Sequence, residues 1–266
     1  MGVRSITLGH YIPGNSLLHR LDPRVKLFSL LVLLTTLFLI KTFTGFFFYT
    51  LIIGSLFLSS GLPRSYFFRG LKPIFYIVLF NLIIHFFFTK GGEVYWRFGA
   101  LTVEEAGVFL GIFMTLRLIL LVITTLLVTL TTSPVSFTAG IEYLLRPLRP
   151  LGVPGQEIAM MMTIALRFIP TLMEESDKIR KAQMARGADF ETGNIFHRAR
   201  QMVPILAPLF ISAFRRADEL AVAMEARCYR GGEKRTRMRE LKTSPPDYIC
   251  IAVVVGICVT VVITGI

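Results

Sequence analysis

The sequence predicts an all-α integral membrane protein, and three observations support this fold class. Hydrophobic residues make up 53% of the 266 positions and include 23 phenylalanines, in runs too long for the core of a soluble domain of this size. Several of these runs are long enough to cross a bilayer as helices. Basic residues are concentrated in alternate connections, as the positive-inside rule requires. We therefore expect about five transmembrane helices.

The first apolar stretch, Leu27–Ser60, is expected to hold two spans. As one helix its roughly 34 residues would extend about 50 Å, whereas the hydrocarbon core is about 30 Å thick. Polar residues at Lys41–Gly45 mark the expected turn. Two further spans are expected at about 73–88 and 106–130, so the region 27–130 is predicted to cross the membrane four times.

Four residues of these spans are expected to have structural roles. Pro23 suits the first turn of a helix, and Asp22 is placed to cap it. Arg24 can extend to the membrane interface. Arg117 lies near the middle of the fourth span, where a charge is costly and is either functional or a structural partner of another helix. No predicted span carries a matching acid, so we favour the structural interpretation.

The charges of the connections also predict the orientation. The N-terminal segment 1–26 and the connection between the second and third spans are basic, whereas the connections on either side of it carry little net positive charge. Basic connections stay in the cytoplasm. The N-terminus and the polar region 131–247 are therefore expected inside a prokaryotic cell membrane. The uncharged segment 248–266 is expected to cross once more and to place the C-terminus outside.

Two long amphipathic helices are expected within the polar region. One spans about 156–186, and the other runs from position 204 or 208 to 227. Both helices are expected to end with similar motifs, Ala182-Gln183-Met184-Ala185-Arg186-Gly187 and Ala223-Met224-Glu225-Ala226-Arg227-Cys228. A single arginine there is explained by its favourable interaction with the helix dipole, about 0.3–1 kcal/mol. Two copies, each preceded by small residues, equally indicate docking into a partner, and the residues alone leave both interpretations open.

The chain resembles the transmembrane T component of energy-coupling factor transporters, a scaffold shared by many prokaryotic vitamin and metal uptake systems. The resemblance covers nearly the whole chain. It rests on Leu21-Asp22-Pro23-Arg24-x-Lys26-Leu27, on Ala165-Leu166-Arg167-Phe168-Ile169-Pro170, on Ala185-Arg186-Gly187, and on Arg216-Ala217-Asp218-Glu219-Leu220-Ala221 leading into Ala226-Arg227.

The resemblance implies where the partners bind. Ala185, Arg186 and Gly187 would form one docking tip, and Ala226, Arg227 and Cys228 the other, each seated in one of two ATP-binding-cassette subunits, identical or different. Cys228 stands where glycine is usual, and cysteine adopts positive φ less readily. An integral-membrane substrate-binding S component would contact apolar residues of the long helices: Met160, Met161, Met162, Leu209, Ala213, Leu220 and Met224.

The sequence carries few signs of chemistry. No phosphate-binding P-loop motif, catalytic set or metal-ligand spacing is recognisable. We therefore expect a non-catalytic subunit without cofactor or metal, with ATP hydrolysis in its partners. The alternative is a regulated membrane enzyme or channel with a basic cytoplasmic region. A nucleic-acid tether is disfavoured because acids are interleaved with the 29 lysines and arginines. The resemblance implies that the choice of solute lies in another chain, the S component.

Overall fold

The computed structural model describes residues 11–98, 101–190, 194–229, 231 and 243–263. Two compact units are present, one formed by 1–144 with 240–266 and the other by 145–239. The sequence analysis divided the chain by the polarity of its segments, which put a limit between 130 and 131. The two units are defined by contacts within the structure, and the first break between them comes later, after Leu144. Both units are built almost entirely from helices, which confirms the predicted fold class.

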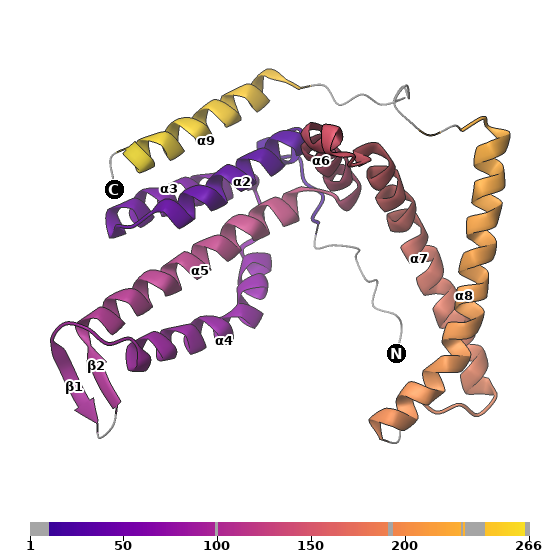
Figure 1. The fold of residues 1–266 in the computed structure, drawn as a ribbon, viewed down its shortest axis with the longest axis horizontal. Coiled ribbons are helices and arrows are strands. Elements are labelled where there is room, and N and C mark those ends of the chain that lie inside the picture. Colours follow the sequence, from indigo (N-terminus) through magenta and orange to yellow (C-terminus); the bar gives the residue numbers. More distant parts are fainter. Residues whose placement is uncertain (1–10, 99–100, 191–193, 230, 232–242, 264–266) are drawn as a thin grey trace. The chain divides into compact units, whose positions relative to one another are not determined.

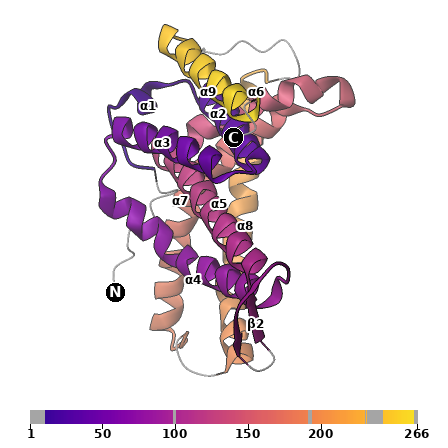
Figure 2. The same cartoon turned by 90° about the vertical axis from the view of Figure 1, so that its left-hand side faces the viewer.

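The first unit contains most of the helices. In chain order they are α1 (Leu17–Arg20), α2 (Pro23–Leu39), α3 (Phe43–Ser60), α4 (Arg64–Phe88), α5 (Glu105–Thr131), α6 (Pro134–Leu145) and α9 (Pro245–Ile263). An antiparallel hairpin, β1 (Val94–Phe98) with β2 (Leu101–Glu104), joins α4 to α5. Helix α5 packs against α2, α3 and α4, and α9 lies along α2 (Figures 1 and 2).

Three helices of the described residues are long and apolar enough to cross a membrane. The qualifying segments are Phe43–Ser60, Phe68–Phe88 and Glu105–Thr131. Helix α2 has 17 residues, and the described apolar part of α9 ends at Thr260. The count of five spans therefore stays a prediction. None of the residues in the apolar span of α4 is buried, and Phe75, Tyr76 and Phe80 are 61–72% exposed, as expected for a helix with one side facing lipid.

The span expected at about 73–88 lies within a longer helix, and the second long helix begins earlier than the expected position 204 or 208. Helix α4 begins at Arg64 and contains Pro73. The second long helix begins at Ile195 and contains Pro204 and Pro208. A proline removes one backbone hydrogen bond and bends a helix without always ending it. Helix α6 and the hairpin were not predicted, since neither shows a strong periodic pattern.

The core of the first unit forms where α2, α3, α5 and α9 meet. Its buried residues are Leu33, Leu37, Ile40, Phe46, Tyr49, Ile53, Leu120, Val254 and Cys258. The Tyr49 hydroxyl is hydrogen-bonded to the Thr124 hydroxyl at 3.0 Å. Since a buried hydroxyl without a partner costs free energy, this pair allows a tyrosine to pack among apolar side chains.

Arg117 lies against the C-terminal end of α2. Its guanidinium donates a hydrogen bond of 2.7 Å to the Ile40 carbonyl, which follows the last residue of α2. The same group lies 5.1 Å from the ring centre of Phe113 and 5.9 Å from those of Phe38 and Phe46. A cation beside the exposed carbonyls of a helix end is stabilising, so these contacts support the structural interpretation of Arg117.

Replacing Arg117 is expected to loosen α2 from α5. Arg117→Met should reduce the free energy of unfolding by about 1.5–3 kcal/mol, the usual contribution of a hydrogen bond to a charged group. Arg117→Lys, which keeps the charge, should have a smaller effect. The apparent unfolding temperature of the purified chain in mild detergent measures this loss. The same change at Arg180, an exposed residue of the second unit, serves as the control.

The N-terminal ends of α2 and α9 are joined by buried polar groups. Asp22 caps its own helix by accepting the Arg24 N–H at 2.9 Å. The Asp247 carboxylate, which is 1% exposed, accepts the Asp22 N–H at 2.8 Å and both the N–H and the hydroxyl of Ser244 at 2.7 and 2.8 Å. One carboxylate of α9 thereby satisfies the backbone at the start of α2.

Helix α5 joins the same cluster through Lys26. The buried ammonium group of Lys26 donates to the Thr131 carbonyl, the last residue of α5, at 3.0 Å. Asp22 and Asp247 both lie within electrostatic reach of it. Pro23 occupies the first turn of α2 as predicted, and the Arg24 guanidinium lies 4.9 Å from the centre of the Tyr143 ring. Three helix ends therefore meet at one buried set of charges.

Candidate functional site at two helix ends

The second unit presents the C-terminal ends of its two long helices, α7 (Gly155–Ala185) and α8 (Ile195–Ala226). They follow a short 3₁₀ segment, Arg146–Leu151. Helices α7 and α8 pack together and cross each other in Figure 1, where α7 runs down the picture and α8 runs up it; Figure 2 shows the same opposed directions. Their C-terminal ends therefore lie at opposite ends of the pair.

The end of α7 is closed by a left-handed glycine. Arg186 is the C-cap, and Gly187 follows with φ of 88°. The N–H of Gly187 donates to the Met184 carbonyl and the N–H of Ala188 to the Gln183 carbonyl, both at 3.0 Å. This pair of bonds is the Schellman motif, which satisfies carbonyls that a helix end otherwise leaves unpaired.

The end of α8 has the same geometry without a glycine. Cys228 has φ of 56°. Among the residues that the structure describes, it alone combines a positive φ with a side chain larger than that of glycine. Its N–H donates to the Glu225 carbonyl at 2.8 Å, and the Tyr229 N–H donates to the Met224 carbonyl at 3.0 Å. Arg227 therefore occupies the position in α8 that Arg186 occupies in α7. The departure from glycine at 228 leaves the cap intact.

The residues of both ends are open to a partner. All six are exposed: Ala185, Arg186, Gly187, Ala226, Arg227 and Cys228. Within the part of the chain that the structure describes, neither arginine side chain has a hydrogen-bond or ion-pair partner. Each end thus carries an exposed guanidinium beside an alanine, on a helix terminus whose last carbonyls are already paired.

The cysteine at 228 is expected to hold its cap under strain. Positive φ disfavours any residue with a Cβ by about 1 kcal/mol, so Cys228→Gly should stabilise the α8 end. The matched change Gly187→Ala meets no atom within 4 Å of its new Cβ and should weaken the α7 end by a similar amount. Hydrogen exchange of the Tyr229 and Ala188 amides reports each cap separately. Equal exchange in the parent and variant chains would show that neither cap is strained.

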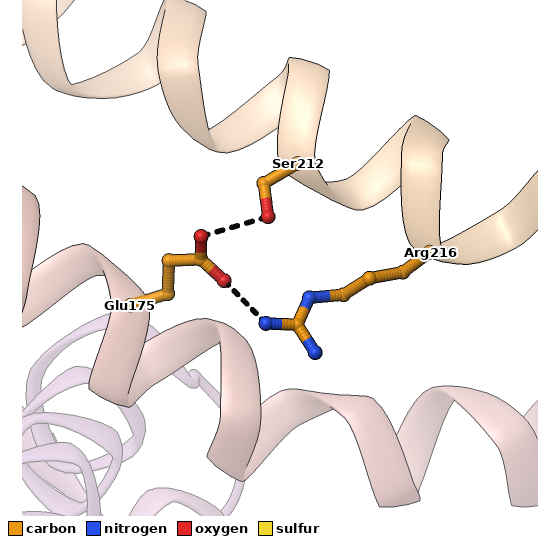
Figure 3. A network of polar contacts seen from close by, with 3 residues as sticks. All are labelled: Glu175, Ser212 and Arg216. Carbon is orange, nitrogen blue, oxygen red and sulfur yellow. Dashed lines mark hydrogen bonds and ion pairs between the residues drawn. The ribbon is translucent and has the colours of Figure 1, made fainter. Parts of the chain in front are cut away.

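A polar cluster ties the two helices together near the middle of the pair. Figure 3 shows the Glu175 carboxylate of α7 between Ser212 and Arg216 of α8. It accepts the Ser212 hydroxyl at one oxygen and the Arg216 guanidinium at the other, each at 2.8 Å. We call these three residues the Glu175 cluster.

The Glu175 cluster is charged at neutral pH. The hydrogen bond from Ser212 and the contacts with Arg216 lower the pKa of Glu175 below its ordinary value. A lowered pKa stabilises the folded state above the ordinary value and loses this effect as the pH falls through the lowered one. The contact is therefore expected to persist across the neutral range. Both partners are partly exposed, which keeps its contribution to stability modest.

An apolar hollow of about 460 Å³ lies beside this cluster, between the middle of α7 and the second half of α8. Its lining residues are Ile164, Phe168, Leu172, Ala213, Arg216, Ala217, Leu220, Ala221, Met224, Glu225 and Tyr229. Three residues predicted to contact an S component, Ala213, Leu220 and Met224, therefore face α7 across the hollow. The remaining four are split, since Met161 is exposed while Met160, Met162 and Leu209 are half-buried.

A second apolar stripe of α8 was missed by the sequence analysis. It consists of Val203, Leu206, Phe210 and Phe214, which are 45–68% exposed. These positions recur at helical spacing. Because α8 is apolar on more than one side, its sequence alone does not show which stripe faces α7. The structure leaves this second stripe uncovered.

Together these features define a helical membrane protein with two matched, arginine-bearing helix ends. Comparison with known proteins gives the family. The model of the CbiQ family, described as cobalt transport protein, matches residues 14–238. The chain is 55% identical to a protein of Thermosediminibacter oceani over 92% of each chain, and 51% identical to one of Clostridium kluyveri over 97% of each. A Bacillus subtilis relative is 48% identical over 91% of this chain and 92% of its own.

These three relatives are each named energy-coupling factor transporter transmembrane protein EcfT. The chain therefore belongs to the EcfT family of transmembrane components of energy-coupling factor transporters. It is a bacterial membrane transport protein, and the resemblance inferred from its motifs is confirmed.

Proposed function

We propose that this chain is the coupling subunit of an ATP-driven importer of a vitamin or metal. Two ATP-binding-cassette ATPases would dock at Arg186 and Arg227, and the chain would pass their motion to a separate substrate-binding membrane subunit. The observation that carries this proposal is the equivalence of the two ends. Each has the same backbone cap and an exposed arginine without a partner among the described residues.

The chemistry of the ends suits insertion into a protein groove. A guanidinium forms paired hydrogen bonds with carboxylates or carbonyls, and the alanine before each arginine lets another surface approach closely. Two equivalent ends also suit two equivalent or closely similar partners, since paired subunits commonly repeat the same contact. If only one partner docked, one such helix end would be enough, and the second copy of the motif would have no role.

The substrate-binding subunit would contact the long helices through their exposed apolar side chains. The stripe Val203, Leu206, Phe210 and Phe214 offers such a surface, and Met161 of α7 is exposed as well. Exposed apolar patches of this kind mark sites of interaction with proteins or membranes. We therefore assign the contact to this stripe in preference to Ala213, Leu220 and Met224, which line the hollow between α7 and α8.

In this proposal the chain itself is not catalytic and needs no cofactor, and the choice of solute belongs to the substrate-binding subunit. The orientation proposed from the charges places the N-terminus and the region 131–247 in the cytoplasm and the C-terminus outside. The docking ends would then face the compartment that supplies ATP.

Co-purification tests this function directly. The chain would be tagged in its native host, extracted in mild detergent, and the associated proteins identified by mass spectrometry. We expect two ATP-binding-cassette subunits and at least one small integral membrane protein. Recovery of the chain without any ATPase would contradict the proposal, and hydrolytic or channel activity of the isolated chain would support the alternative function.

A further inference from the structure

The hairpin between α4 and α5 exposes two aromatic side chains that the proposed function does not use. Tyr95 and Trp96 follow one another in β1 and are 61% and 70% exposed, and Val94 before them is exposed as well. Trp96 is the single tryptophan of the sequence. Exposed groups of large apolar side chains mark sites of interaction with proteins or membranes, so this hairpin carries a surface that needs an occupant.

Backbone hydrogen bonds fix the base of the hairpin to the start of α5. The Glu105 N–H donates to the Glu93 carbonyl at 2.9 Å, and the Ala106 N–H donates to the Gly91 carbonyl at 3.0 Å. The Glu104 carboxylate accepts the Gly91 N–H. A two-stranded hairpin by itself is only marginally stable in water. Because of these bonds, the position of the hairpin follows that of α5.

The hairpin joins two helices that contact lipid. The segments Phe68–Phe88 of α4 and Glu105–Thr131 of α5 are each long and apolar enough to cross a membrane. The hairpin between them is therefore expected at one surface of the bilayer, whichever way the chain is oriented. In Figure 1 it turns away from the axis of α5 where that helix begins. Exposed aromatic residues, Phe88 and Phe109, also lie near the two helix ends that the hairpin joins.

Two physical limits set how deeply the hairpin can enter the bilayer. The outer edges of a two-stranded sheet present backbone N–H and C=O groups that the hydrocarbon core cannot pair. Lys90 and Glu93, just before β1, are exposed charged residues, and charges are costly to remove from water. In water, however, the Tyr95 and Trp96 rings would gain nothing from apolar burial. The headgroup layer satisfies both limits, since these two side chains combine an apolar ring with a polar group.

We propose that Tyr95 and Trp96 anchor the hairpin in the headgroup layer of the membrane. The irregular pairing of the strands favours a joint role. Consecutive side chains of a regular strand point to opposite faces, but the pairing of β1 with β2 is interrupted between Val94 and Trp96. Such a bulge re-aims the side chains beside it, which allows both rings to enter the same layer. The anchor holds the start of α5 at a fixed depth, and this inference does not depend on the proposed function.

The single tryptophan makes this depth measurable in the unmodified chain. The purified chain would be reconstituted into vesicles of phosphatidylcholine and phosphatidylglycerol whose acyl chains carry bromine either near the headgroup or near the bilayer centre. We expect Trp96 fluorescence to be quenched more strongly by the shallow bromine than by the deep one. Stronger quenching by the deep bromine, or quenching by dissolved iodide alone, would overturn the anchor.

A second reporter calibrates the depth scale. The variant Trp96→Phe with Phe80→Trp carries its single tryptophan within the apolar span of α4, at an exposed position. Its fluorescence should be quenched more strongly by the deep bromine. If the two reporters showed the same preference for one bromine position, Trp96 would not lie in the headgroup layer and the anchor would be refuted.

Removing the other ring tests whether the two residues act together. We expect Tyr95→Ser to shift the emission of Trp96 to longer wavelength and to increase its quenching by iodide, because the hairpin loses half of its anchor. Glu93→Ser, an exposed position beside the same strand, is the control and should change neither. Hydrogen exchange of the Glu105 amide, which bonds to the Glu93 carbonyl, shows whether the base of the hairpin stays formed. Unchanged emission in Tyr95→Ser with this base formed would contradict a joint anchor.

The same quenching in the co-purified complex distinguishes lipid from a protein occupant. If lipid covers the hairpin, quenching by the shallow bromine persists in the complex. Its loss there would show that another subunit covers Trp96 and would overturn the lipid anchor. Failure of the chain to bind any ATPase contradicts the proposed function instead, and the measurement on the chain alone still decides the anchor.

Discussion

Reversing the charge of both docking ends, Arg186→Glu with Arg227→Glu, is expected to separate the chain from its ATPases and abolish ATP-driven uptake. Each glutamate would place a negative charge where a guanidinium is proposed to be bound. Loss of one partner of such a buried charge pair costs about 2–5 kcal/mol at an interface. Both arginines are exposed in the chain alone, so its own folding should lose only their interaction with the helix dipoles, about 0.3–1 kcal/mol at each end.

The measurement is the amount of ATPase recovered with the tagged double variant. A control with the same change in net charge is Arg180→Glu with Arg215→Glu, at two exposed positions of the same helices. We expect normal recovery with the control and none with the double variant. Each single reversal should also stop uptake, because one end alone cannot transmit a relative motion. Full assembly and uptake in both single variants would refute docking at these ends.

The two docking ends illustrate what could be predicted from the sequence. Arg186 before Gly187 predicts a helix end because glycine readily adopts positive φ. Cys228 made the second end less certain, since a cysteine there is strained. The structure shows the same hydrogen bonds at both ends. The repeated alanine and arginine were therefore a better indicator of this cap than the residue that follows them.

The surfaces of α8 could be predicted only in part. Periodicity identifies apolar stripes, but the helix has two of them, one with Ala213 and Leu220 and the other with Phe210 and Phe214. The packing of α7 decides which stripe is covered, and that contact is not local in the sequence. The pairing of Glu175 with Arg216, 41 positions away, was missed for the same reason. Many acids and bases of this region offered equally plausible pairs.

Asp247 was likewise interpreted from the sequence as no more than the polar boundary of the last span. Asp247→Ala is nevertheless expected to be the most destabilising single change in the first unit. It would remove three hydrogen bonds at once and leave the buried Asp22 N–H without its acceptor. The ammonium of Lys26 would also lose a nearby negative charge. A hydrogen bond to a charged group typically contributes about 1.5–3 kcal/mol, and this change removes three of them.

The loss should appear as a lower apparent unfolding temperature in detergent and as faster proteolysis near the start of α9, which Asp247 fastens to α2. Asp247→Asn keeps the shape and the acceptor oxygen but removes the charge, so its effect should be intermediate. Asp218→Ala, at an exposed position of α8, should have almost none. If Asp247→Ala and Asp218→Ala unfolded at the same temperature, the polar cluster would not be what joins these helix ends. Apolar packing of α9 along α2 would then have to hold the last helix in place by itself.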